Sequence, residues 1–136
     1  MDRVVTEPKE GASSPDPFMS LLDITQQALE SAMSGSMLRQ TLLTNNLANV
    51  DTPGYQPEDV NFQSTLANAI QSGQPLSSVS YQPYSVAQSV GADGNGVSPE
   101  QQEAAMSTNG LLYETLTQVA AQRESILESA MGIGQP

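Results

Sequence analysis

Two adjacent carboxylates, Glu58 and Asp59, are the side chains with the clearest potential for acid–base chemistry in this sequence. The chain contains no His and no Cys. This excludes a Ser-His-Asp triad, a thiol nucleophile, a disulfide and any metal site ligated by imidazole or thiolate. A carboxylate-based catalytic pair or cation site would need further acids at a fixed spacing. We therefore interpret the pair as part of a solvated turn, and we expect no catalytic residues, no enzymatic activity, no cofactor and no bound metal.

A cluster of amides precedes these acids, because Asn45, Asn46 and Asn49 fall within five residues. Asn tolerates the backbone conformation at helix C-termini, so the cluster is consistent with a simple helix end. Alternatively, the amides hydrogen-bond to the following turn, or to a neighbouring chain, and fix its angle. Tyr55 has a similar pair of interpretations, a local anchor of the turn or a contact with another chain, since its ring is amphipathic. The sequence leaves these alternatives open.

Two long helices are predicted to position these residues. Apolar residues recur with helical spacing over residues 18–50 and again over 98–131. The first helix must end before Pro53, which disfavours helical backbone at Thr52, and Pro53-Gly54 is typical of a type II turn. The residues expected to form the packing stripes of the two helices are Leu29, Met33, Leu43, Leu112, Tyr113, Leu116, Val119, Ile126 and Leu127.

Three further residues of these helices have roles that the pattern does not decide. Gly35 interrupts the first helical pattern and weakens the helix by about 1 kcal/mol relative to Ala, so the helix bends there or a neighbour approaches closely. Arg39 and Arg123, one in each long helix, are the only basic residues after residue 9. We expect salt bridges to acids on the partner helix, with a role in the register of assembled chains as the alternative.

The remaining segments complete a mainly α fold with a single domain over residues 18–131. Residues 1–17, rich in Pro and charge, are predicted to be a disordered extension. A turn over 51–59 leads to a short helix over 60–72. Residues 73–97, rich in Gly, Pro, Ser and Gln, are predicted to be a flexible connector, and 132–136 a tail. We expect the two long amphipathic terminal helices to pair as a coiled-coil-like unit.

The composition limits the partners of this 136-residue chain. Only four basic residues oppose fifteen acidic ones, so nucleic acid and anionic membranes are excluded as partners. The sequence contains no apolar run long enough to insert into a membrane. It shows no apolar leader either, so we expect no cleaved secretory signal. Aromatic residues make up 4 % of the chain, which is little for a self-sufficient core, and we expect self-association.

One stretch closely resembles the signature of the bacterial flagellar rod and hook axial proteins. Its eight matching positions are Asn46, Leu47, Ala48, Asn49, Thr52, Pro53, Gly54 and Tyr55. Other stretches, at residues 26–29, 38–40, 59–62 and 93–97, together with Asn109 and Tyr113, resemble the flagellar basal-body rod protein B family. The resemblance covers about residues 18–131, and Gln56 and the acidic C-terminal end depart from the family pattern.

The resemblance implies a structural subunit of the proximal rod of the flagellar basal body. Such a subunit is exported by the flagellar type III apparatus, without a cleaved signal peptide. It assembles helically in the periplasmic rod, which transmits torque for motility. The implied partners are other rod proteins, the ring–rod adaptor protein, the MS-ring protein and the type III export gate. Phe18 and Leu22 resemble the short apolar export signal of rod and hook subunits, although they can equally begin the apolar face of the first helix.

Two alternative functions remain. The neighbouring proximal rod protein C shares the signature, and the position of the subunit in an assembled basal body would separate it from rod protein B. A cytoplasmic helical adaptor, which inserts one helix into the groove of a partner, belongs to a different class. Such an adaptor would stay in the cytoplasm, whereas a rod subunit is present in purified basal bodies.

Overall fold

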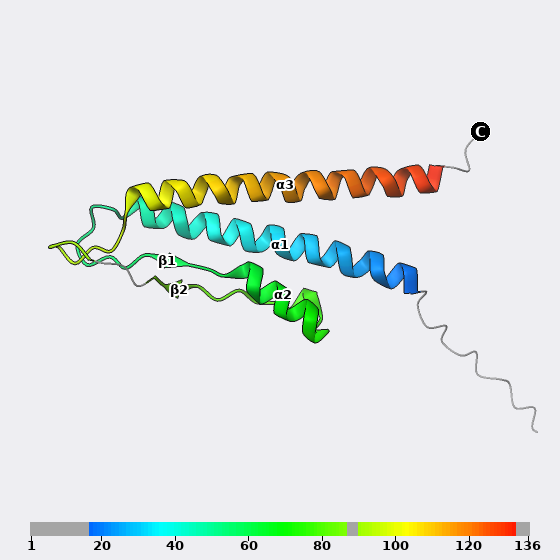
Figure 1. Ribbon diagram of the computed structural model, residues 1–136, viewed down its shortest axis with the longest axis horizontal. Coiled ribbons are helices and arrows are strands. Elements are labelled where there is room, and N and C mark those ends of the chain that lie inside the picture. The colour runs from blue at the N-terminus through cyan, green and yellow to red at the C-terminus, as the bar shows by residue number, and fades with distance from the viewer. Residues whose placement is uncertain (1–16, 87–89, 133–136) are drawn as a thin grey trace, which may run out of the picture.

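The computed structural model describes residues 17–86 and 90–132 (Figure 1). Its elements are the helices α1 (Pro17–Ala48), α2 (Phe62–Ser72) and α3 (Pro99–Gly132), the short strands β1 (Glu58–Asp59) and β2 (Tyr84–Ser85), and the 3-10 helix η1 (Leu76–Ser78). The predicted fold class, mainly α with two long terminal helices that pack together, is confirmed.

The helix ends differ slightly from the predicted ranges. Pro17 is the first residue of α1, whereas the rest of the extension predicted over 1–17 lies outside the described residues. Gly132 is the last residue of α3, and the rest of the predicted tail also lies outside them. The first helix ends at Ala48, and the next residues turn through the hydrogen bond from Thr52 N to Asn49 O, at 3.0 Å. No described helix is long and apolar enough to cross a membrane.

The elements form three layers, with α1 in the middle (Figure 1). On one side α3 runs antiparallel to α1, and on the other side lie α2 and the pair of strands. With 32 and 34 residues, the two long helices extend over about 48 and 51 Å at 1.5 Å per residue. The result is an elongated unit in which most apolar contacts are made along α1.

A small apolar core lies between α1 and α2. It is formed by Ala32, Leu66, Ala69 and Leu76, with Ala28, Val79, Tyr81 and Leu116 packed against it. Gly35 permits the close approach of α2, because a Cβ at this position would lie 2.6 Å from the side chain of Phe62. Phe62 also contacts Tyr81 edge-on, with ring centroids 6.0 Å apart. Of the two readings of Gly35, the structure thus shows the close approach of a neighbour.

The connector between α2 and α3, residues 73–97, makes defined contacts with the rest of the chain, which its composition did not predict. The two strands pair antiparallel, with Glu58 opposite Ser85 and Asp59 opposite Tyr84. The Tyr81 hydroxyl lies 2.6 Å from that of Ser31 on α1 and 3.1 Å from the Ser31 carbonyl oxygen. Described residues of the segment predicted to be flexible are therefore held along α1.

Candidate assembly site

Asn46 is the most fully hydrogen-bonded side chain of the signature region. Its Nδ2 donates to Glu58 O at 2.8 Å and to Gln102 Oε1 at 2.9 Å. Its Oδ1 accepts from Glu58 N at 3.0 Å and from the Tyr55 hydroxyl at 3.3 Å. A carboxamide has two N–H groups and two acceptor positions, so this side chain, 1 % exposed, is completely satisfied. It joins α1 to the turn, to β1 and to the first turns of α3.

Asn95 lies in the loop that precedes α3, and its side chain binds the backbone of the turn that follows α1. Its Nδ2 lies 2.9 Å from the carbonyl oxygens of Asn49 and Val50, and 2.7 Å from that of Thr52. Its Oδ1 accepts from Val97 N at 2.7 Å. These three carbonyls belong to the turn after α1, so the Asn95 amide joins this turn to the loop before α3.

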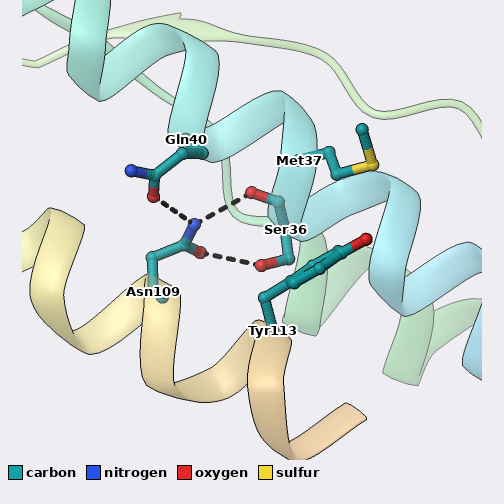
Figure 2. A pocket seen from close by; sticks show the side chains of 6 residues that line it. Ser36, Met37, Gln40, Asn109 and Tyr113 are labelled. Atoms are coloured by element: carbon teal, nitrogen blue, oxygen red, sulfur yellow. Dashed lines mark hydrogen bonds between the residues drawn. The ribbon is translucent and has the colours of Figure 1, made fainter. Parts of the chain in front are cut away.

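Asn109 joins α3 to α1 through hydrogen bonds to Ser36 and Gln40, as Figure 2 shows. Its Nδ2 donates to Ser36 O and to Gln40 Oε1, both at 2.9 Å. Its Oδ1 accepts from the Ser36 hydroxyl at 3.2 Å. The Asn109 side chain is 1 % exposed, so these contacts are shielded from water.

Asn46 and Asn109 define one register between the two long helices, and Asn95 joins the turn after α1 to the loop before α3. A shift by one helical turn would move each amide about 5.4 Å from its partners and leave buried polar groups unpaired, which costs about 1–3 kcal/mol per group. Among the residues that the structure describes, no buried side-chain nitrogen or oxygen lacks a hydrogen-bond partner. We refer to Asn46, Asn95 and Asn109 as the asparagine locks.

The two adjacent carboxylates have different environments. Asp59 accepts from Arg39 in a bidentate pair, with Nε–Oδ1 at 2.8 Å and Nη2–Oδ2 at 3.0 Å, and this hydrogen bonding raises the pKa of the Arg39 guanidinium. Glu58 is exposed and joins the network through its backbone. No group of three or more acidic side chains in the described part of the chain could hold a metal ion.

The salt bridges expected between the long helices are not the ones formed. Arg39 pairs with Asp59 of β1 and not with an acid of α3. Arg123 donates to the carbonyl oxygen of Leu22 and to Oε1 of Gln26, and it pairs with no acid among the described residues. The prediction was wrong because sequence spacing does not show which acids lie within reach after the helices pair.

A groove of about 280 Å³ opens between α1 and α3 next to the Asn109 lock (Figure 2). Its lining residues are Ser36, Met37, Gln40, Asn109, Gly110 and Tyr113. Gly110 contributes to the open space, because a Cβ at this position would meet no other atom within 4 Å.

The signature residues do not all gather at one point. Asn46 and Tyr55 are in contact, whereas Asn49 makes local bonds, donating to Asn45 O at 2.8 Å and accepting from the Thr52 hydroxyl at 3.1 Å. The structure therefore shows both a local helix end and a bond to the following turn. Of the remaining signature residues, Leu47 is half-buried, and Ala48, Thr52, Pro53 and Gly54 are exposed.

The predicted packing stripes divide into two groups. Leu43 is buried, and Leu29, Met33, Leu112, Tyr113, Leu116 and Leu127 are half-buried. Val119 and Ile126, by contrast, are 45 % and 62 % exposed in the single chain. Packing of these two against a neighbour stays a prediction. Both export-signal candidates lie in α1, where Leu22 is half-buried and the side chain of Phe18 lies outside the described residues.

Two important residues were missed from the sequence. Asn95 stands in an Asp-Gly-Asn-Gly run, which indicated a turn and formed part of the resemblance at 93–97, but neither signal predicted its contacts with the turn after α1. Gln102 occupies a buried position of α3, and a polar residue among charged neighbours carries no signal that could have identified it.

Comparison of the sequence with known proteins shows similarity to flagellar rod proteins. The model of a family described as "Flagella basal body rod protein" matches residues 27–56. Two relatives are named flagellar basal body rod protein FlgB. That of Bacillus subtilis (strain 168) is 48 % identical over 48 residues, and that of Escherichia coli (strain K12) is 37 % identical over 62 residues. These alignments span 35 % and 46 % of this chain, but only 37 % and 45 % of the length of the relatives.

A longer match decides the family. The FlgB protein of Aeromonas hydrophila is 31 % identical over 98 residues, which cover 62 % of this chain and 74 % of that protein. The chain belongs to the flagellar basal body rod protein B family. The segment matched by the rod family model, 27–56, includes one asparagine lock, Asn46. It also includes the two residues of α1, Ser36 and Gln40, that bind a second lock, Asn109.

Proposed function

We propose that this chain is a structural, non-enzymatic subunit of the proximal rod of the bacterial flagellar basal body. It is exported by the flagellar type III apparatus and assembles helically with other rod proteins in the periplasm. There it transmits torque for motility. Membership of the rod protein B family supports this proposal, as do the long paired helices in the chain.

One observation carries the proposal most directly, an uncharged stripe on α3 with three apolar side chains that the single chain leaves uncovered. We name it the outer stripe, and its residues are Leu111, Thr115, Gln118, Val119, Gln122 and Ile126, all exposed and uncharged. Residues spaced three, four or seven apart share one face of a helix. The face that meets α1, marked by Asn109 and Leu116, is a different one.

The outer stripe is suited to packing between subunits. Leu111, Val119 and Ile126 are 65 %, 45 % and 62 % exposed, with uncharged polar side chains between them. Exposed apolar groups on one face of a helix are suited to an interaction surface. The long helix can thus pack on α1 with one face and on a neighbouring subunit with another. This is the arrangement that a helical filament of paired helices requires.

The asparagine locks suit a component that transmits torque. Apolar side chains alone allow paired helices to slide, because such contacts are non-directional, whereas hydrogen-bonded amides define one axial position. The paired helices then transmit force as one rigid body, because they do not slide along each other. This argument rests on the buried contacts of Asn46 and Asn109 with α3 and α1 respectively.

The partners follow from the proposed position. We propose contacts with other rod proteins, the ring–rod adaptor protein and the MS-ring protein after export, and with the type III export gate before it. Leu22, part of the proposed export signal with Phe18, has its carbonyl oxygen bound by Arg123 in the folded chain. Recognition by the gate would therefore precede the pairing of α1 with α3.

The experiment that tests this proposal is recovery of the chain in basal bodies. A strain that expresses the Leu111→Gln/Ile126→Gln double variant is compared with one that expresses Met131→Gln, an exposed apolar residue of α3 outside the outer stripe. Basal bodies and cytoplasm are then separated and probed for the chain. We expect the control in basal bodies, and the double variant exported but depleted from them.

Two results would contradict the proposal. Wild-type chain confined to the cytoplasm would indicate the adaptor alternative. A deletion strain that swims normally and builds complete basal bodies would exclude a role in the rod. Localisation of the chain within an assembled basal body would also distinguish rod protein B from rod protein C.

A further inference from the structure

A glycine follows two of the three asparagine locks. The pairs are Asn95-Gly96 and Asn109-Gly110, whereas Asn46 is followed by Leu47. Glycine has no Cβ to hinder its backbone nitrogen and allows a wide range of backbone angles. An Asn-Gly pair in a flexible chain is therefore prone to lose the asparagine amide. We propose that Asn95 and Asn109 are sites of spontaneous deamidation, that folding shields them, and that their conversion separates α1 from α3.

The chemistry requires only water. The backbone nitrogen of the glycine gives up its proton and attacks Cγ of the preceding asparagine, which forms a C–N bond and a five-membered imide. The side-chain nitrogen leaves as ammonia and carries the proton. Water then opens the imide at either carbonyl, to give aspartate or isoaspartate. The net change is addition of water and loss of ammonia.

In the folded chain, both attacking nitrogens are engaged elsewhere. Gly96 N donates to Tyr55 O at 3.1 Å. Gly110 lies inside α3, where backbone N–H groups bond to the preceding turn. The asparagine side chains are also held away from attack, since their Nδ2 atoms donate to carbonyl and amide oxygens of α1 and of the turn after it. Unfolding removes both restraints together.

Deamidation would replace a hydrogen-bond donor by an acceptor in the side chains of Asn95 and Asn109. In Asn109, the donor Nδ2 faces two acceptors, Ser36 O and Gln40 Oε1. In Asn95, it faces three carbonyl oxygens. A carboxylate oxygen in either place would point at acceptors without a proton to share. One carboxylate oxygen keeps its donor, the Ser36 hydroxyl at Asn109 and Val97 N at Asn95, but the other faces acceptors only. An incompletely paired buried charge is strongly unfavourable, so we expect the modified chain to lose the native contacts of these locks. This inference does not depend on the proposed function.

The first test compares rates of deamidation within one full-length chain. The protein is incubated in mildly alkaline buffer with and without concentrated urea, and peptides are mapped by mass spectrometry. In urea, we expect Asn95 and Asn109 to react faster than Asn46, the internal control. Without urea, we expect both to react at least about tenfold more slowly, because attack requires local opening. Equal rates in the two buffers, or equal rates at all three residues in urea, would overturn the proposal.

Two sets of variants complete the test. In urea, Gly110→Ala should slow the reaction at Asn109 and leave that at Asn95 unchanged, and an unchanged rate at Asn109 would refute the mechanism. Asn95→Asp and Asn109→Asp reproduce the product directly, and Asn68→Asp, at an exposed position of α2, is the matched control of charge. We expect far-UV circular dichroism to show reduced helix only in the first two. Equal helix content in all three would show that deamidation leaves the helix pair intact.

Discussion

Asn46 Nδ2 donates to Gln102 Oε1 at 2.9 Å and so joins two residues 56 positions apart in the sequence. Both side chains are buried. One lies near the end of α1 and the other near the start of α3. The signature region therefore has a structural role inside the single chain, because it connects the end of one long helix to the beginning of the other.

Replacement of Asn46 by Ala should destabilise the helix pair by about 1–3 kcal/mol, because it leaves the backbone of Glu58 and the amide of Gln102 without partners in a buried site. Asn45→Ala is the matched control, since Asn45 is exposed. Urea denaturation followed by circular dichroism at one protein concentration would measure both. Equal midpoints for the two variants would contradict the role assigned to Asn46.

The two helix-interior glycines should respond oppositely to substitution by Ala. At Gly35 the new methyl group would lie 2.6 Å from Phe62, so α2 must move away, at a cost of about 1–3 kcal/mol. At Gly110 the methyl group meets open space, and the gain in helix propensity should stabilise the chain by up to about 1 kcal/mol. Thermal denaturation of the two variants would show the difference. Stabilisation by Gly35→Ala would mean that α2 does not pack closely on α1.

Neutralising the two adjacent acids, Glu58 and Asp59, should have different effects on stability. Asp59→Asn should destabilise the chain by about 1 kcal/mol, since it removes the charge from a partly buried bidentate pair with Arg39. Glu58→Gln should have little effect, because that carboxylate is exposed. A double-mutant cycle with Arg39→Gln would isolate the pair energy. A coupling energy near zero would show that the observed geometry contributes nothing to stability.

Substitutions in the turn after α1 should impair assembly more than export. This prediction rests on the proposed function. Gly54 has a φ of 72°, and a Cβ at this position would meet no other atom within 4 Å, so we expect Gly54→Val to add backbone strain of about 1–2 kcal/mol. Pro53→Ala loosens the same turn. Gly54→Asn is the control, since Asn tolerates this conformation. We expect the Val and Ala variants to be exported but poorly incorporated into basal bodies, and retention of both in the cytoplasm would contradict this.

Much of the fold was predictable because its signals are local. Apolar spacing marked the two long helices, and Pro53 and Gly54 marked the turn between α1 and β1. Specific contacts of the connector were not predictable, because Tyr81 finds Ser31 on α1 only after the chain has folded back. The same applies to Asp59, which the sequence could not distinguish from its neighbour Glu58.

The sequence by itself determined the helical elements, the absence of His and Cys chemistry and the resemblance to rod proteins, since these depend on composition and on residues close together in the chain. Only the tertiary structure decided which amides become locks and which apolar residues stay uncovered. Periodicity places Leu116 and Ile126 on a helix but does not show which face meets α1. That choice depends on how two helices more than 50 residues apart pack, and the hydrogen bonds of Asn46 and Asn109 define their register.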